Sequence, residues 1–167
     1  KSALLAAFDQ GWADPKKISQ SAARAAILRN QAVETIASKL GIPSHAIEIL
    51  GEPALGHYLG IAGLLDEATT FAYAATDKGK IRAVARSHHG RVVELQVNPD
   101  GEIIYPTDFH QPTVLSLQLA NSETGVIQRN PKMNFSSIAI DATTSGAQIP
   151  LPDKWDTALF DATSWAG

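Results

Sequence analysis

The feature of this sequence that most limits its possible folds is an alternation between strand-like and helix-like patterns. Short apolar or β-branched runs typical of buried strands occur at residues 47–50, 70–74, 91–97, 113–119, 137–141 and 157–161. Helical patterns separate several of these runs. Strands that alternate with helices predict an α/β fold with one mostly parallel sheet flanked by helices.

Three segments carry helix signals. Apolar residues recur at three- and four-residue spacing from residue 19 or 21 to about Lys39, and Gly41 and Pro43 end this pattern. Pro53 suits the first turn of a second helix that continues through residues 59 and 65, and residues 79–86 predict a short third helix. The face expected to be buried on the longest helix consists of Ala25, Leu28, Ala32, Ile36 and Leu40. Because no repeat or low-complexity linker interrupts the chain, we expect a single domain over residues 1–167.

Charge and composition exclude several classes of function. The 14 Lys and Arg residues are spread among 17 Asp and Glu residues, so no basic cluster predicts nucleic-acid binding. No apolar run approaches the ~20 residues that cross a bilayer, and no secretory signal follows Lys1. Without cysteine, and with histidines that lack metal-site spacing, we expect no metal. We expect a cytoplasmic protein whose native chain begins before Lys1, which is not an initiator methionine.

The most informative stretch runs from Ser116 to Gln128 (SLQLANSETGVIQ). It resembles the cysteine desulfurase signature, in which a strand ends in Asn-Asn-Glu-(Thr/Ile)-Gly and is followed by a hydrophobic pair and Gln. The run from Ile140 to Gly146 (IDATTSG) is similar to the same family's Asp-Ala-x-Gln-x-x-Gly. Asp14-Pro15, before the long helix, resembles the family's Asn-Pro. The chain therefore resembles the large domain of the cysteine desulfurases, class V aminotransferase-like enzymes that depend on pyridoxal phosphate (PLP).

This resemblance implies a fold, a cofactor and a set of contacts. Family members have a PLP fold type I large domain, with a seven-stranded, mostly parallel sheet, and work as homodimers. An Asp pairs with the pyridine nitrogen, a His stacks on the ring, a turn and a Ser hold the phosphate, and a Lys forms the Schiff base. By the resemblance, Asp141 stands at the pyridine-nitrogen position. The other vestigial cofactor-binding positions are Asn121, Thr144 and Thr163.

The remaining positions depart from the family pattern. Ser164 occupies the place of the Schiff-base lysine, so no catalytic residue carries over. Glu52 and Asp161 put negative charge where the family binds phosphate, at a cost of roughly 1 to 4 kcal/mol for each charge pair at ~4 Å. The other departures are Pro53 in the phosphate turn, Lys78 for the stacking His, Ser122 for the second Asn and Thr144 for Gln.

The chain is also shorter than the family's large domain. Only residues 129–136 connect Gln128 to the next strand, where the family has a helix. We therefore expect apolar sheet surface to be bare at this point, or covered by another chain. The family's persulfide-carrying Cys and its C-terminal small domain would lie beyond Gly167.

Three interpretations follow. In the first, the chain is a degenerate desulfurase-like domain that has lost PLP binding and catalysis. It then acts as a structural or interaction pseudoenzyme, as a homodimer or with a partner chain. In the second, it is a fragment of an active PLP-dependent desulfurase or aminotransferase whose catalytic parts lie elsewhere. In the third, it is an unrelated small-molecule-binding α/β domain, and the match over residues 116–146 is coincidental.

Overall fold

The computed structural model describes residues 2, 5–6, 13–109 and 111–165. The chain separates into two compact units, Lys1–Ile49 and Leu50–Gly167. The assignment of residues 1–167 to one domain stays a prediction. Ala166 and Gly167, the end of the segment matched to the family's Schiff-base motif, lie outside the described residues.

The first unit contains the predicted long helix, α2 (Gln20–Leu40). Ser19 caps its start, because the Ser19 hydroxyl accepts a hydrogen bond from the Ala22 amide at 3.1 Å. Gly41 ends it in the left-handed conformation, with φ of 68°. The expected apolar face is only partly correct: Leu28 and Ala32 are exposed. The buried residues of the helix are Ala22, Val33 and Ala37.

The predicted strand at residues 47–50 is wrong. This segment follows the short 3-10 turn η1 (Ser44–Ala46) and belongs to none of the strands of the sheet. Its Ile49 side chain is 48% exposed. A short apolar run predicts a strand only when a neighbouring strand is available for pairing, and the sequence pattern does not contain that information.

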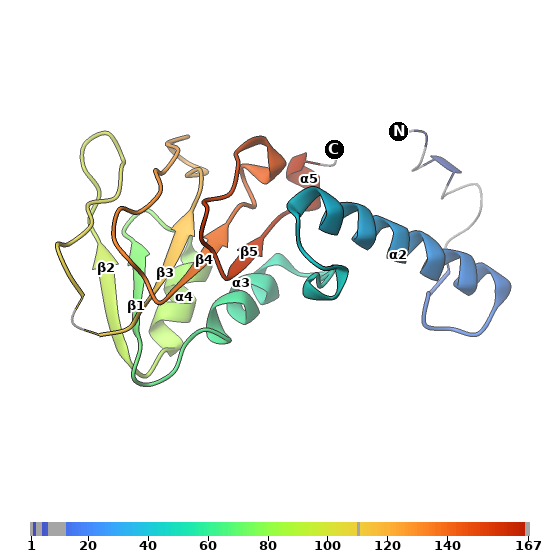
Figure 1. Ribbon diagram of the computed structural model, residues 1–167, viewed down its shortest axis with the longest axis horizontal. Coiled ribbons are helices and arrows are strands. Elements are labelled where there is room, and N and C mark those ends of the chain that lie inside the picture. Colours follow the sequence, from blue (N-terminus) through green and yellow to red (C-terminus); the bar gives the residue numbers. More distant parts are fainter. Residues whose placement is uncertain (1, 3–4, 7–12, 110, 166–167) are drawn as a thin grey trace. The chain divides into compact units, whose positions relative to one another are not determined.

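The second unit is built on one five-stranded sheet with strand order β2-β1-β3-β4-β5, and every pairing in it is parallel (Figure 1). This confirms the predicted fold class. The bounds of the strands are β1 (Thr70–Ala74), β2 (Arg91–Leu95), β3 (Thr113–Gln118), β4 (Ser137–Asp141) and β5 (Thr157–Leu159). Val97, predicted as the end of the second strand, instead forms an isolated antiparallel bridge with Ile103.

One face of the sheet is covered by the helices α3 (Pro53–Ala62) and α4 (Gly79–Ser87). Side chains that alternate along the strands, such as Phe71 and Val114, pack there with Ile61 and Ile81. Pro53 takes the first position of α3 as predicted, but this helix ends at Ala62, earlier than expected. The short helix predicted at residues 79–86 is confirmed as α4, which extends one residue further.

The opposite face is covered by connecting loops in place of helices. From β1 the chain steps to β2 at one edge of the sheet, and from β2 it then proceeds toward the other edge through β3, β4 and β5. Because parallel crossovers are right-handed, this reversal puts the connections after β2 on the face opposite to α4. Each of these connections contributes an aromatic side chain to the core: Tyr105, Phe135 and Trp155. Apart from the 3-10 turn η2 (Gly146–Gln148), the described part of these connections contains no helix.

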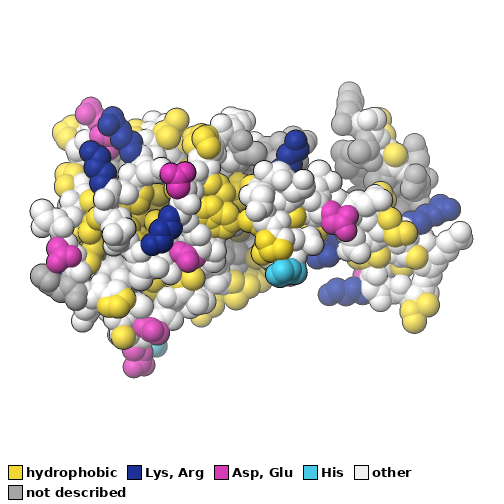
Figure 2. All heavy atoms as spheres, viewed as in Figure 1, with side chains coloured by type: hydrophobic (Ala, Val, Ile, Leu, Met, Phe, Trp, Pro, Cys, Tyr) yellow, Lys and Arg dark blue, Asp and Glu magenta, His cyan; other side chains and the backbone are white. Residues whose placement is uncertain are grey.

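This arrangement corrects the expectation of bare sheet surface after Gln128. Leu115 and Leu117 of β3 are fully buried, because Phe135 and Met133 of the short connection lie over that face. Hydrophobic side chains nevertheless remain visible among the loops in Figure 2, next to scattered charged groups. Exposed apolar side chains of these loops include Ile104 and Ile127.

Candidate binding site

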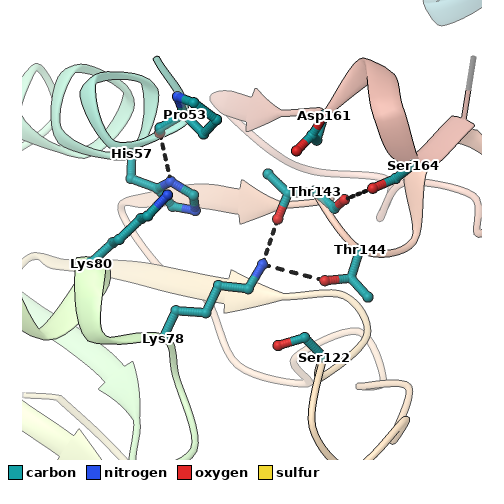
Figure 3. A pocket seen from close by; sticks show the side chains of 9 residues that line it. All are labelled: Pro53, His57, Lys78, Lys80, Ser122, Thr143, Thr144, Asp161 and Ser164. Carbon is teal, nitrogen blue, oxygen red and sulfur yellow. Dashed lines mark hydrogen bonds between the residues drawn. The ribbon is translucent and has the colours of Figure 1, made fainter.

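A cavity of about 290 Å³ lies at the carboxyl ends of the strands. The strand order reverses between β1 and β3, and in open α/β sheets ligands bind outside the carboxyl ends of strands at such a switch point. The residues that line the cavity come from loops and helices that are distant in sequence (Figure 3). They are Pro53, His57, Lys78, Lys80, Ser122, Thr143, Thr144, Asp161 and Ser164.

Asp141 is the central charged group beneath this cavity. It ends β4, and only 3% of its side chain is exposed. Its Oδ2 atom lies 3.2 Å from His57 Nε2 and 3.1 Å from Lys78 Nζ. Its Oδ1 atom accepts hydrogen bonds from the backbone amide of Thr143, at 3.0 Å, and from the Thr143 hydroxyl. One carboxylate is thus surrounded by two basic side chains and a turn.

These neighbours determine the charge of Asp141. Burial by itself raises the pKa of a carboxyl group. The contacts with His57 and Thr143 and the charge of Lys78 outweigh this effect, and they hold the pKa of Asp141 well below its ordinary value. Asp141 is therefore an anion at neutral pH, and its charge is balanced from within the chain.

His57 reaches Asp141 from α3. Its Nδ1 atom lies 2.9 Å from the carbonyl oxygen of Pro53, one turn earlier in the same helix. A carbonyl oxygen only accepts, so Nδ1 carries a proton. In a neutral ring the unprotonated Nε2 would then face a carboxylate with no hydrogen between them. A ring with a proton on each nitrogen would donate to both the Pro53 carbonyl and the Asp141 carboxylate.

Lys78 reaches the same carboxylate from the residue that precedes α4. Its ammonium group donates hydrogen bonds to the hydroxyls of Thr143 and Thr144. Figure 3 shows this group between the two hydroxyls, with Lys80 extending from the same end of α4. The position matched to the family's stacking aromatic ring therefore holds a cation that is bonded to the turn after β4.

The residues of the last predicted motif lie at the rim of the cavity. The Ser164 hydroxyl, in the short helix α5 (Ala162–Trp165), donates a hydrogen bond to the Thr143 carbonyl oxygen. The Asp161 carboxylate accepts from the amide and the hydroxyl of Thr163, at 2.9 and 2.7 Å. These bonds lower the pKa of Asp161. Thr163 is therefore bonded to its own turn.

Asn121 organises its loop and does not line the cavity. Its side-chain oxygen accepts hydrogen bonds from the amides of Glu123 and Thr124, at 3.0 and 2.9 Å. Its side-chain nitrogen donates to the carbonyl oxygen of Thr76 at 2.9 Å. Of the four predicted cofactor-binding residues, the structure brings Asp141 and Thr144 together around Lys78. Asn121 bonds its own loop and Thr76, and Thr163 bonds the adjacent Asp161.

Sequence reasoning missed three residues of the site. His57 was considered only as a metal ligand, although a histidine inside an apolar helix four residues after Pro53 signals a buried polar contact. Lys80 and Thr143 lie within two residues of Lys78 and Thr144, two positions that the family resemblance had identified. The sequence could not reveal that α3, α4 and the turn after β4 converge on one cavity.

A second buried carboxylate lies beside the site. Asp77, between β1 and Lys78, is 2% exposed. Its Oδ2 atom accepts a hydrogen bond from the Ala74 amide at 2.9 Å. Burial raises the pKa of Asp77 to about 7, the nearby Asp141 charge adds to this rise, and the Ala74 hydrogen bond and the charges of Arg82 and Lys78 oppose it. This group changes charge near neutral pH.

The described residues contain neither a metal-binding cluster nor a membrane-spanning helix. No group of three or more His, Asp or Glu side chains is placed to hold a metal ion. No helix of this part of the chain combines the length and hydropathy that a membrane span needs.

No protein-family model matches the chain, and no curated protein matches its sequence. Solved structures do match it. A NifS-like protein covers 92% of this chain with a TM-score of 0.73 and 18% sequence identity, and the match spans 48% of that protein. An alanine aminotransferase from Pyrococcus furiosus covers 81% with a TM-score of 0.59 and 12% identity, and the match spans 41% of that protein.

The chain therefore spans less than half the length of these two proteins. At such low identity the likeness concerns the fold and carries no residue roles. The parallel sheet, its flanking helices and these matches agree on one conclusion: the chain has an α/β fold shared with a NifS-like protein and an alanine aminotransferase.

Proposed function

We propose that this chain is a cysteine desulfurase-like, class V aminotransferase domain that has lost PLP binding and catalysis and acts as a structural or interaction pseudoenzyme. The observation that carries the proposal is the pairing of Asp141 with His57 and Lys78, at 3.2 and 3.1 Å. The resemblance assigns Asp141 to the pyridine nitrogen of the cofactor. Two side chains of the chain itself, His57 and Lys78, already lie against the carboxylate oxygen that a pyridinium would need.

The residues matched to the phosphate turn also fit PLP poorly. Glu52 is the N-cap of α3, and its carboxylate accepts a hydrogen bond from the Ala54 amide at 2.9 Å. Helix N-termini bind phosphate through such free amides and a favourable dipole. At α3 an internal carboxylate takes one amide, Pro53 removes a second donor, and the negative charge of Glu52 repels a phosphate dianion.

The position of the Schiff-base lysine adds a third argument. Ser164 cannot form an imine, and its hydroxyl is engaged with the Thr143 carbonyl. Without the imine, a cofactor would lose its covalent anchor as well as its partner at Asp141. The residues present therefore do not fit PLP, and no catalytic step through the cofactor is assigned to this chain.

Titration with PLP tests this proposal. We expect no saturable aldimine absorbance, and no lysine labelled above background after borohydride reduction and peptide mass spectrometry. The exposed Lys132 supplies the background, because PLP reacts slowly with any accessible amine. Preferential labelling of Lys78 or Lys80 over Lys132 would contradict the proposal.

One observation favours the alternative of a fragment from an active enzyme. The cavity contains two lysines, Lys78 and Lys80, and the chain spans 48% of the NifS-like protein. An aldimine on either lysine, or a complementing chain that supplies the missing part, would support this alternative. The same trapping experiment, repeated with Lys78→Met and Lys80→Met variants, would identify the reactive amine.

Assembly with a second chain is part of the proposal. The hydrophobic side chains that remain among the loops over the sheet, and the exposed Leu55, Tyr58 and Leu59 of α3, support a homodimer or a tightly held partner. Light scattering at micromolar concentration should give twice the chain's 17.8 kDa. A monomer that persists at high micromolar concentration would contradict homodimerisation. The cytoplasmic location stays a prediction.

A further inference from the structure

The strand β2 forms one edge of the sheet, and its outer side is open (Figure 1). The Leu95 carbonyl oxygen accepts a hydrogen bond from the Ala75 amide, so the backbone groups of Leu95 face β1. Successive residues of a strand direct these groups to opposite sides, so the amides and carbonyls of Val92 and Glu94 point away from the sheet. They have no hydrogen-bond partner among the described residues, and the Val92 side chain is 38% exposed.

Arginine side chains flank this edge on both faces of the sheet. Arg82 and Arg86 lie one turn apart on the same side of α4. The Arg82 Nη1 atom donates a hydrogen bond to the Ala75 carbonyl oxygen at 3.3 Å, which places this side of α4 beside the ends of β1 and β2. Side chains alternate along a strand, so Arg91 lies on the same face as Leu95, which packs in the core under the loops.

The positive charge at this edge is not neutralised within the chain. Residues 78–91 (KGKIRAVARSHHGR) contain five Lys and Arg residues and neither Asp nor Glu. Within the part of the chain that the structure describes, Arg86 and Arg91 form neither an ion pair nor a hydrogen bond. The carboxylate of β2 itself, on Glu94, accepts a hydrogen bond from the Tyr73 hydroxyl at 2.9 Å. Three guanidinium groups therefore face one carboxylate, and the edge has a net positive charge.

These charges decide which strand fits the open edge. Two copies paired along β2 would bring their arginines together, and like charges across a strand pair are destabilising. An acidic strand meets no such repulsion. We propose that β2 binds an extended acidic segment of a partner protein, which joins the five-stranded sheet as a further strand with its carboxylates beside Arg82, Arg86 and Arg91. This inference rests on the proposed function, because it names the partner chemistry of the interaction role.

The test is the fluorescence anisotropy of a fluorescein-labelled peptide that alternates glutamate and valine, titrated with the whole chain at pH 7 and constant ionic strength. We expect saturable binding. A peptide with glutamine in place of every glutamate should bind about tenfold more weakly, because its contacts with the arginines lose their charge. A glutamate peptide that is N-methylated at alternate amides should lose affinity by about tenfold as well, because those amides donate to the strand edge.

Variants of the chain separate the arginines from the backbone. Arg82→Gln and Arg86→Gln together should weaken binding about fivefold to tenfold, since each exposed charge pair contributes modestly. Arg29→Gln removes the same charge from an exposed position of α2 and should change the affinity less than about twofold. Val92→Pro removes an outward amide, and proline is tolerated on edge strands, so peptide binding should be lost while the far-ultraviolet circular dichroism is unchanged.

Several outcomes would overturn the edge site. Equal binding of the glutamate, glutamine and N-methylated peptides would do so, and so would equal effects of Arg29→Gln and the double variant. Tighter binding of a single-stranded oligonucleotide would assign the arginines to nucleic acid, and loss of self-association in Val92→Pro, seen by light scattering, would assign the edge to a second copy. The PLP trapping experiment is independent: a trapped lysine refutes the loss of PLP binding, and failure of the peptide titration without such an adduct refutes only the edge site.

Discussion

Replacement of Asp77 by asparagine should stabilise the protein, increasingly so as the pH rises. In the folded chain, burial raises the pKa of Asp77 from its ordinary value of 3.8 to about 7. The difference of roughly 3 pH units corresponds to on the order of 4 kcal/mol, at about 1.4 kcal/mol per unit. This is the free energy by which ionised Asp77 destabilises the fold above pH 7.

The direction follows from proton binding. Below pH 3.8 both states hold the proton, and Asp77 has no effect on stability. Between about pH 4 and 7 the unfolded chain loses the proton while the folded chain keeps it, so the free energy of unfolding falls as the pH rises. An asparagine side chain at this position has no such proton to lose, and its oxygen can still accept the hydrogen bond from the Ala74 amide.

Urea unfolding at pH 5, 6, 7 and 8 in constant salt measures this effect. The advantage of Asp77→Asn over the natural chain should grow by roughly 2 to 3 kcal/mol between pH 5 and pH 8. Asp153→Asn, at an exposed carboxylate, is the matched control and should show a constant difference. An advantage that is constant, or that shrinks with rising pH, would refute the assignment of Asp77 as a buried carboxyl that titrates near neutrality.

Three further substitutions test the fold and the site. Asp141→Asn leaves His57 and Lys78 without their counter-charge and should cost about 3 to 5 kcal/mol at pH 7 in urea unfolding; a loss below about 1 kcal/mol would contradict a buried charge cluster. Leu115→Ala empties a fully buried position of β3 and should cost about 2 to 5 kcal/mol, and a neutral result would contradict the packing of the loop-covered face. Ser19→Ala removes the cap of α2 and should cost about 1 kcal/mol, seen as faster amide exchange at Ala22; unchanged exchange would contradict the cap.

Much of the fold could be predicted from the sequence because the signals were local. The bounds of β1 and β4 match the apolar runs 70–74 and 137–141. The middle residues of these strands are buried on both faces, so the runs 71–74 and 138–140 contain no charged residue. The caps of α2 were also readable, because Ser19 and Gly41 act within a single turn of backbone.

The failures concern information that lies in tertiary contacts. The run 47–50 has the composition of a strand but no strand to pair with. The short connection after Gln128 was expected to leave the sheet bare, yet Phe135 and Met133 of that connection pack over this face together with aromatic side chains of the neighbouring loops. In the site, the resemblance drew attention to Asp141, but the pairing of its carboxylate with His57 depends on the packing of α3, which no local motif encodes.

The place of β1 and β3 in the sheet has a consequence for how the chain reaches its native state. β2 and β1 form one half of the sheet and β3, β4 and β5 the other, and the strand pairing between these halves is that of Thr70–Ala72 with Thr113–Leu115. Closing the long intervening loop costs chain entropy before any contact rewards it. Lys78 follows the first half and Asp141 ends a strand of the second, so their ion pair links the two halves. The lining of the cavity also comes from both halves, so its native geometry requires that they have come together.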